Sequence, residues 1–346
     1  MFHLLGEKIE TKNSNIISPI ATGNGAYIVH KTLESRIPDY QVIPYNPYRT
    51  LFPPSLLPLG RFSSTGLIHT TPDYAFFHVR KNVPLILTFH NYVLDRFMRD
   101  YSSALQNIHY QTDLKILTKL AVVKADTLTA VSQFTADLVR REMKLAAKIK
   151  VIYNGVDHTM FTPKRQNHNK QTNKINVLFC GNLTQRKGVM WISPIADRLD
   201  RNIKIHYTSG LHPSGTLANH PQLHCLGAVP YQKMPVVYQD ADILLFPTVR
   251  EGLALAALEA MSCGLPVVAT DCSSLPELID DGKGGFLCPL GDVDAFADKI
   301  RYLAENSQLR REMGDYNRAK VEKMFTLDRM IGQYKELFEE VLSNHN

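Results

Sequence analysis

The chain carries the sequence FPTVREGLALAALEAMSCGLPVVAT at residues 246–270. An apolar strand ends at Phe246, a loop containing Glu251 follows, and a long apolar helix begins after that loop. Gly264 stands where a helix commonly ends in a left-handed residue, and Pro266 starts the next apolar run. Strand, loop, helix and strand in this order predict a βαβ unit of a parallel sheet.

The same alternation extends along the chain in both directions. It predicts two doubly wound α/β domains, at 1–157 and 158–327, with a polar linker at 158–174 and a last helix at about 328–346 that packs back on the first domain. Strands are expected at 15–19, 41–43, 67–70, 84–89, 127–130, 150–153, 175–180, 203–208, 223–226, 243–246 and 266–270. Helices are expected at 26–33, 95–122, 133–144, 189–199, 231–239, 253–263, 293–306 and 309–323.

Composition excludes several classes of protein. The chain has 346 residues, of which 44% are hydrophobic and 21% charged, values typical of a soluble protein of about two domains. No apolar run approaches the ~18 residues that span a bilayer, and the first residues reach Glu7 too soon for a secretory leader. The five cysteines form no C-x-x-C pair, so we expect reduced thiols in the cytoplasm.

The net charge of +6 lies in the first half of the chain. Residues 1–157 hold 18 Lys and Arg against 12 Asp and Glu, whereas residues 158–346 hold 21 of each. This asymmetry favours an anionic partner such as nucleic acid, a membrane surface or a phosphorylated substrate, or else reflects a solvated basic face. Basic residues cluster at 140–150 and again at Arg96, Arg99, Lys115, Lys119 and Lys124.

A second strand–loop–helix unit opens the second domain with the sequence VLFCGNLTQRKG at residues 177–188. Gly181 permits a tight turn after the strand, and Arg186 and Lys187 stand where the next helix begins. Free N–H groups and the helix dipole already favour anions at such a position, so the pair of cations predicts a diphosphate site. The alternative is an exposed basic turn.

Two carboxylates lie eight residues apart in the 246–270 segment. At 1.5 Å per residue, Glu251 and Glu259 are about 12 Å apart along the helix axis, with the free N–H groups of residues 253–255 beside the first. Carboxylates accept hydrogen bonds from vicinal hydroxyls, so this spacing suits a sugar at one end and a ribose at the other, with a diphosphate between them. The alternative is a helix with one N-terminal and one solvated Glu.

These segments resemble the retaining glycosyltransferases of family 4, which have the GT-B fold. Residues 179–188 resemble the family's G-N-L-x-x-x-K-G turn, and 226–230 its G-x-V segment. Residues 151–161 resemble the P-N-G-V-D-x-x-x-F hinge, with Tyr153 in place of proline, and 88–90 resemble the T-x-H element. The resemblance implies an α/β GT-B protein, with two Rossmann-like domains facing each other across a cleft.

The resemblance also implies roles for individual residues. Catalytic residues would be Glu251, His90, Arg186 and Lys187: Glu251 would hold hydroxyls of the donor sugar, His90 would lie beside the sugar, and the two cations would neutralise the diphosphate. Glu259 would hold the ribose. The donor-binding set would be Gly23, Asn24, Gly25, Gly181, Arg186, Lys187, Val229, Glu251, Gly252, Leu253, Ala254, Leu255 and Glu259.

The implied activity is transfer of a sugar, with retention, from a UDP- or GDP-linked donor to a hydroxyl of a glycan or lipid-linked acceptor. This would serve cell-surface polysaccharide or glycolipid synthesis, in the cytoplasm or at an anionic cytosolic membrane face, without a cofactor, a metal ion or nucleic acid. A nucleotide-sugar epimerase and a catalytically silent nucleotide-sugar-binding subunit remain as alternatives.

Two further motifs have simpler explanations. Gly23-x-Gly25 lacks the third glycine of a dinucleotide fingerprint, because Ile28 occupies that position. Asp240-Ala241-Asp242 has D-x-D spacing but precedes a buried strand, so we expect it to flank structure. Ala254 and the pair Ser273-Ser274 replace glycines that are common in the family.

Overall fold

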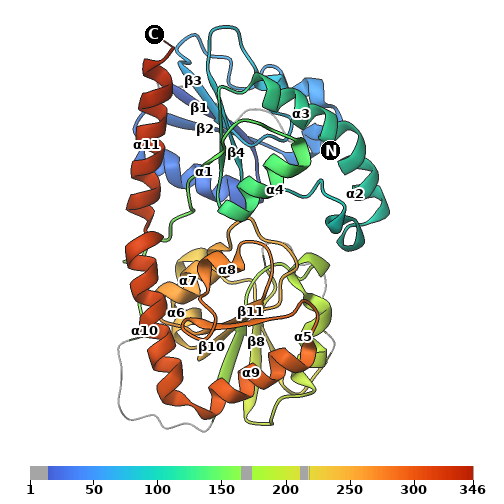
Figure 1. Cartoon of the computed structure of the whole chain (residues 1–346), viewed down its shortest axis with the longest axis vertical. Coiled ribbons are helices and arrows are strands. Elements are labelled where there is room, and N and C mark those ends of the chain that lie inside the picture. The colour runs from blue at the N-terminus through green and yellow to red at the C-terminus, as the bar shows by residue number, and fades with distance from the viewer. Residues whose placement is uncertain (1–14, 165–173, 211–216, 218, 346) are drawn as a thin grey trace, which may run out of the picture. The chain divides into compact units, whose positions relative to one another are not determined.

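The computed structural model describes residues 15–164, 174–210, 217 and 219–345. Two six-stranded sheets with parallel strand pairing form its framework, which confirms the predicted α/β class (Figure 1). The strands are β1 Ile16–Ala21, β2 Tyr40–Tyr45, β3 Leu67–Thr70, β4 Leu85–Phe89, β5 Thr127–Ala130, β6 Lys150–Val151, β7 Ile175–Phe179, β8 Ile203–Thr208, β9 Leu223–Gly227, β10 Ile243–Phe246, β11 Val267–Thr270 and β12 Gly285–Cys288.

Helices connect most consecutive strands, as parallel pairing requires. The α-helices are α1 Gly25–Arg36, α2 Ala104–His109, α3 Lys115–Lys124, α4 Gln133–Met143, α5 Val189–Ala196, α6 Met234–Gln239, α7 Leu255–Ser262, α8 Leu275–Leu278, α9 Val293–Glu305, α10 Ser307–Met324 and α11 Leu327–Ser343. Short 3-10 segments are η1 Pro47–Leu51, η2 Pro53–Leu56, η3 Ala75–His78, η4 Phe97–Tyr101, η6 Gln185–Lys187 and η7 Tyr231–Lys233, and η5 Tyr110–Leu114 is a π-helical turn.

The chain divides into two compact units. The first comprises residues up to Thr88 together with Asp113–Thr129 and Tyr334–Asn346, and the second comprises Phe89–Thr112 and Ala130–Gln333. The predicted domain limits at 157 and 327 stay a prediction. Most of the linker expected at 158–174 lies outside the described residues.

The second sheet follows the strand order β12-β11-β10-β7-β8-β9. Alternate residues of its strands enter two different cores, because successive side chains of a strand point to opposite faces. Leu178, Leu244 and Phe246 pack with α7 and α10, whereas Val177 and Leu245 pack with α5 and α9. Apolar residues on both faces explain why these strands appear in the sequence as continuous hydrophobic runs.

A polar network lies inside the first unit. Tyr40 Oη bonds to Nδ1 of both His30 and His69, at 2.8 and 2.7 Å, and His69 Nε2 bonds to Thr88 Oγ1 at 2.7 Å. The ring of Phe338, on the last helix, packs against those of Tyr40 and His69. The C-terminal part of α11 is therefore fixed to the first unit through its core.

Two sequence expectations differ from the structure. The single helix expected at 95–122 is divided into η4, α2, η5 and α3, and Ser103 and Gln106 form a capping box at the start of α2. The strand β12 is absent from the predicted set. Within the described residues, no helix has both the length and the apolar character needed to cross a bilayer.

Candidate functional site

The order of strands in the second sheet defines a topological switch point. If the strands are numbered within that sheet in chain order, the spatial order is 3-2-1-4-5-6. The first strand, β7, pairs with β8 on one side and with β10 on the other. Ligands of such sheets bind beyond the carboxyl ends of the strands at this point. The loops after β7 and β10 carry Arg186, Lys187 and Glu251, so the structure brings the predicted donor residues of these two loops together.

The loop after β7 is tied to the loop after β10. Arg186 O accepts hydrogen bonds from Val249 N at 2.8 Å and Thr248 Oγ1 at 3.0 Å. Gly188 has a φ of 74°, and a Cβ there would lie 1.8 Å from Pro247 O and 2.9 Å from the ring of Trp191. Only glycine fits this crossing, and it fixes the position of η6.

Lys187 and Glu251 form a buried ion pair at the centre of this site. Lys187 Nζ lies 2.6 Å from Glu251 Oε1, and the same oxygen accepts a hydrogen bond from Thr248 Oγ1 at 2.8 Å. Burial alone would raise the pKa of Glu251, but the charges of Lys187 and Arg186, with the hydrogen bonds from Lys187 and Thr248, hold that pKa below its ordinary value. Glu251 is therefore an ionised carboxylate with a fixed orientation.

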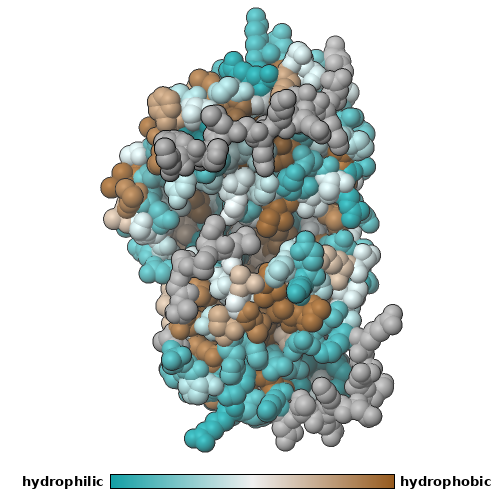
Figure 2. Space-filling view, turned by 180° about the vertical axis from the view of Figure 1, so that it is seen from behind, coloured by the Kyte–Doolittle hydropathy of each residue, from teal (hydrophilic) through white to brown (hydrophobic). Residues whose placement is uncertain are grey.

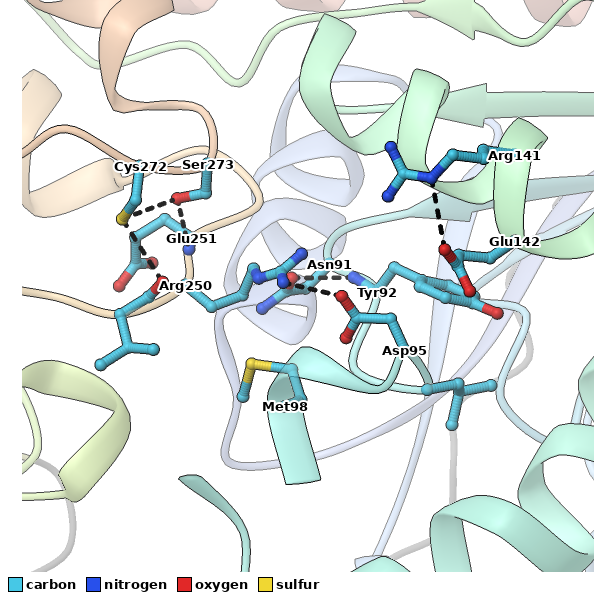
Figure 3. Close-up of polar contacts among 12 residues, drawn as sticks. Asn91, Tyr92, Asp95, Met98, Arg141, Glu142, Arg250, Glu251, Cys272 and Ser273 are labelled. Atoms are coloured by element: carbon cyan, nitrogen blue, oxygen red, sulfur yellow. Dashed lines mark hydrogen bonds and ion pairs between the residues drawn. The ribbon is translucent and has the colours of Figure 1, made fainter. Parts of the chain in front are cut away.

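Two serines hold the backbone of Glu251, and one of them, Ser273, is labelled in Figure 3. Ser273 Oγ accepts a hydrogen bond from Glu251 N at 3.1 Å, and Ser274 Oγ donates one to Glu251 O at 3.3 Å. Ser273 has a φ of 51°, a conformation that favours glycine, so the serine hydroxyl is kept at a position where its backbone is strained. Sequence reasoning treated this pair as a departure from the family and missed its contact with Glu251.

Glu259 lies on α7 and is buried. Its Oε2 accepts a hydrogen bond from Tyr238 Oη at 2.8 Å, and Tyr238 Oη in turn lies 3.1 Å from Cys180 Sγ. Burial raises the pKa of Glu259 to about 7, although hydrogen bonds from Tyr238 and Tyr231 act in the opposite direction. The expectation of a solvated Glu does not apply here, since only 8% of the residue is exposed.

This raised pKa predicts a pH-dependent stability. The folded protein binds a proton at Glu259 more tightly than the unfolded chain, so stability falls as pH rises from about 4.5 to about 7, by on the order of 3 kcal/mol. Glu259→Gln should remove this loss. At pH 8 its melting temperature should exceed that of the wild type by several degrees, and at pH 4.5 the two should coincide.

The matched control is Glu305→Gln, because Glu305 is an exposed carboxylate of the same unit. It should melt as the wild type does at both pH values. A Glu259→Gln protein with an unchanged pH dependence of melting would show that this carboxyl is not the titrating group.

His90 follows β4 directly and its backbone meets the Glu251 loop. A Cβ at Gly252 would lie 1.8 Å from His90 O, so only glycine permits this approach. Burial lowers the pKa of His90 to about 3. The imidazole is therefore neutral near pH 7 and offers one donor and one acceptor nitrogen.

Arg250 and Asp95 form a second buried pair that sequence reasoning missed (Figure 3). Arg250 Nη2 lies 2.7 Å from Asp95 Oδ2, and the guanidinium lies over the rings of Phe97 and Phe134, at 4.9 and 5.2 Å from their centroids. One feature of the sequence could have indicated this role of Arg250: it is a cation next to Glu251 within a largely apolar segment. The pair fixes the segment after His90 to the loop that carries Glu251.

The remaining predicted residues lie in several places. Gly181, with a φ of 144°, lies beside the Lys187 side chain, whereas Leu253 and Ala254 precede α7 and Leu255 begins it. Val229 follows β9 in the second unit. Gly23, Asn24 and Gly25 lie in the first unit, where the Asn24 side chain caps α1 by accepting a hydrogen bond from Tyr27 N at 2.8 Å.

The D-x-D motif has structural partners. Asp240 pairs with Lys164 at 2.6 Å, and Asp242 accepts a hydrogen bond from Asn176 N at 2.8 Å. Within the described part of the chain, no three His, Cys, Asp or Glu side chains gather as a set able to hold a metal ion.

Comparison with protein families adds the identity of the chain. The family described as Glycosyltransferase Family 4 matches residues 21–159, and that described as Glycosyl transferases group 1 matches residues 174–306. This chain belongs to the family 4 glycosyltransferases. The resemblance predicted from the Glu251 and Lys187 segments is confirmed.

Individual relatives of this glycosyltransferase are distant in sequence. N-acetyl-alpha-D-glucosaminyl L-malate synthase from Bacillus anthracis is 22% identical over 89% of this chain and 84% of its own length. Alpha-maltose-1-phosphate synthase from Mycolicibacterium smegmatis is 23% identical over 93% of this chain and 89% of its own length.

Solved structures share the fold of this glycosyltransferase. Sucrose-phosphate synthase from Thermosynechococcus elongatus matches with a TM-score of 0.80 at 18% identity, over 95% of this chain and all of that one. Alr3699/HepE from Anabaena, crystallised with UDP and glucose, matches with a TM-score of 0.77 at 17% identity, over 94% of this chain and 99% of that one. The GT-B fold expected from the sequence is confirmed.

Proposed function

We propose that this glycosyltransferase transfers a hexose, with retention of its anomeric configuration, from a UDP- or GDP-sugar to a hydroxyl of a glycan or lipid-linked acceptor. The observation that carries the proposal is the Lys187–Glu251 pair at the switch point of the second sheet. It places a fixed cation and a fixed carboxylate next to each other, as a diphosphate joined to a sugar requires.

The donor would be held from three sides. Lys187 has three N–H donors, one of which bonds to Glu251, so two remain for the diphosphate. Arg186 adds a second cation, and the free N–H groups at the start of α7 add further donors. Glu259 would accept hydrogen bonds from the ribose through Oε1, because Tyr238 bonds to Oε2.

The reaction would use these groups to stabilise charge on the leaving diphosphate. Glu251 would orient the sugar and stabilise positive charge that develops on its ring. His90, neutral near pH 7, would hydrogen-bond to the sugar and would not act as a cation. The leaving phosphate would take the acceptor proton, as family resemblance suggests, so no protein nucleophile is needed.

The names of relatives support this class of donor. The Anabaena structure contains UDP and glucose, and the Bacillus anthracis relative is named N-acetyl-alpha-D-glucosaminyl L-malate synthase. We infer cell-surface polysaccharide or glycolipid synthesis in the cytoplasm as the setting, with no role for nucleic acid.

The test is a panel of UDP-, GDP- and ADP-sugars, first screened for a rise in melting temperature, which reports binding to the native state. The stabilising donor is then incubated with acceptor hydroxyls, and the product anomer is assigned by NMR. Retained configuration in a transfer product supports the proposal, whereas an inverted product contradicts it. Isomerisation of the donor without acceptor would identify an epimerase, and binding without turnover a silent subunit.

Turnover should not depend on a divalent metal. Arg186 and Lys187 supply the positive charge that a metal ion supplies to a diphosphate in other transferases, and Asp240 and Asp242 are engaged elsewhere. The chelator EDTA, at about 5 mM, should change the turnover number less than twofold. Loss of activity on chelation that magnesium or manganese restores would refute this.

The acceptor side would meet an anionic membrane through α3. Its exposed residues Ile116, Leu120 and Val123 share one face, opposite the buried Thr118, Ala121 and Val122. Lys119 and Lys124 are exposed beside this apolar face. In the upper part of Figure 2, several hydrophobic residues (brown) lie at the surface among hydrophilic ones (teal).

The prediction is that vesicles containing phosphatidylserine sediment the protein and that salt weakens this binding, at about 1 kcal/mol per cation near the surface. Replacing Leu120 and Val123 by Asp should release the protein to the supernatant. The basic helix α4 offers a control, because its Leu138 and Val139 are buried and Arg140 and Arg141 pair with neighbouring acids. Reversing Arg140 and Arg141 to Glu should leave binding within about threefold. Release by the α4 variant alone would contradict the α3 assignment.

A further inference from the structure

The first unit contains a basic pocket that has no part in the proposed donor site. Its volume is about 470 Å³, and it is lined by two short segments, 61–63 and 79–81. The side chains are those of Arg61, Phe62, Ser63, Val79, Arg80 and Lys81. Three of these six residues are cationic and none is acidic.

The Arg80 side chain joins the two segments, and local backbone contacts shape each of them. Gly60 has a φ of 66°, which turns the chain into Arg61, and its carbonyl accepts hydrogen bonds from Phe62 N and from the Arg80 guanidinium. Arg80 also forms an antiparallel bridge with Val83 around a turn in which Asn82 has a φ of 61°. The pocket walls are therefore fixed in position before any ligand binds.

Within the part of the chain that the structure describes, no acidic side chain neutralises the positive charge of this pocket. Among the described residues, no carboxylate forms an ion pair with Arg61, Arg80 or Lys81, and the buried Arg80 Nε has no hydrogen-bond partner. Burial, and then the neighbouring charge of Arg61, lower the pKa of the Arg80 guanidinium from its ordinary value. Buried donors without partners and like charges at close range both cost free energy, which a bound anion would recover.

We propose that this pocket binds the phosphate group of a phosphate ester. Guanidinium groups bind phosphate oxygens in pairs, so Arg61 and Arg80 suit a doubly charged phosphate, with Lys81 as a third cation. The Ser63 hydroxyl adds a neutral donor. Phe62 and Val79 provide apolar surface for the carbon part of the ester. Assigning this phosphate to the acceptor rests on the proposed function, whereas the binding itself does not.

The experiment follows backbone amide signals of the deuterated full chain by NMR while inorganic phosphate or glycerol 3-phosphate is added. Signals of residues 61–63 and 79–81 should shift with one common dissociation constant. Arg61→Glu with Lys81→Glu should raise this constant at least tenfold, and the spectrum should otherwise stay that of the folded protein, because both residues are exposed. Shifts in these segments that persist unchanged in this variant would overturn the proposal, as would their absence in the wild type.

A charge-matched control is Lys31→Glu with Lys335→Glu, since both lysines are exposed in the same unit. It changes net charge equally and should leave the dissociation constant within about twofold. Phosphate bound at the donor loop would shift the signals of residues 185–188, and those shifts should remain in the Arg61, Lys81 variant. Failure of the donor site and failure of this pocket are thus seen at different residues.

A soluble short-chain lipid distinguishes the source of the phosphate. Dioctanoyl phosphatidic acid, used below its micelle concentration, should bind at least tenfold tighter than glycerol 3-phosphate where the natural ligand is a lipid headgroup, and should also shift Phe62 and Val79 further. Equal affinities identify a soluble phosphate ester. Both results keep the phosphate site, and binding of neither compound at 61–63 and 79–81 rejects it.

Discussion

Glu251→Gln should lower the turnover number about 100- to 1,000-fold, which is the range for losing one fixed charge at a transition state. The glutamine keeps the shape of the side chain, and its amide oxygen still accepts hydrogen bonds from Thr248 and Lys187. It removes only the negative charge that would stabilise the sugar ring. Unfolding free energy should fall by about 1–2 kcal/mol, less than the change in activation free energy.

The comparison variant is Glu259→Gln, which makes the same chemical change on the same segment. It should raise the KM for the donor and leave the turnover number within about threefold, because its proposed partner is the ribose. Turnover of Glu251→Gln near the wild-type value with the true donor would remove the sugar-orienting role. Equal effects of both variants on turnover would argue against separate roles for the two carboxylates.

Replacing Arg186 and Lys187 together by Ala should raise the dissociation constant for the nucleoside diphosphate at least 100-fold. Each charged hydrogen bond contributes about 1.5–3 kcal/mol, so two lost contacts exceed the roughly 2.7 kcal/mol that a hundredfold change requires. Calorimetric titration with the nucleoside diphosphate of the preferred donor measures the change. Unaltered affinity would remove both residues from the diphosphate site.

Loss of Lys187 should also affect folding stability, and this effect must be distinguished from the loss of affinity. Without its ammonium, the buried Glu251 carboxylate keeps the Thr248 hydrogen bond and the charge of Arg186, and it loses its direct ion pair. Lys187→Ala should therefore also destabilise the fold. Adding Glu251→Gln to Lys187→Ala should restore part of that stability and none of the affinity. Arg201→Ala with Lys233→Ala, two exposed cations of the same unit, controls for net charge and should leave affinity unchanged within about twofold.

Much of the fold follows from local sequence. The predicted bounds 67–70, 127–130, 203–208 and 243–246 agree with β3, β5, β8 and β10, because buried parallel strands are short apolar runs with polar residues at their ends. The strand β12 was missed because its apolar run has only three residues, 286–288, after two glycines. Pairing with β11, from Val267 opposite Gly285 to Thr270 opposite Cys288, defines it.

The sequence predicted which loops form the site, but it did not predict the contacts between their side chains. Residues after strands were expected to carry the chemistry, and the loops after β7 and β10 do meet. The Lys187–Glu251 pair joins residues that are 64 positions apart in the chain. The sequence analysis assigned one of them to the phosphate and the other to the sugar, and did not predict that they contact each other. The serines that hold Glu251 and the Asp95–Arg250 pair also depend on tertiary packing, for which local patterns contain no signal.

The crossing at Gly188 places the chain's single tryptophan beside the donor loop. Trp191 N donates a hydrogen bond to Gly188 O at 3.0 Å, and the indole ring lies against Gly188 and Gly291. All indole fluorescence of the protein thus arises within one helical turn of Lys187. Movement of η6 when a nucleotide binds can be followed by emission from the unlabelled protein, in stopped-flow as well as at equilibrium, without any residue of the site being replaced.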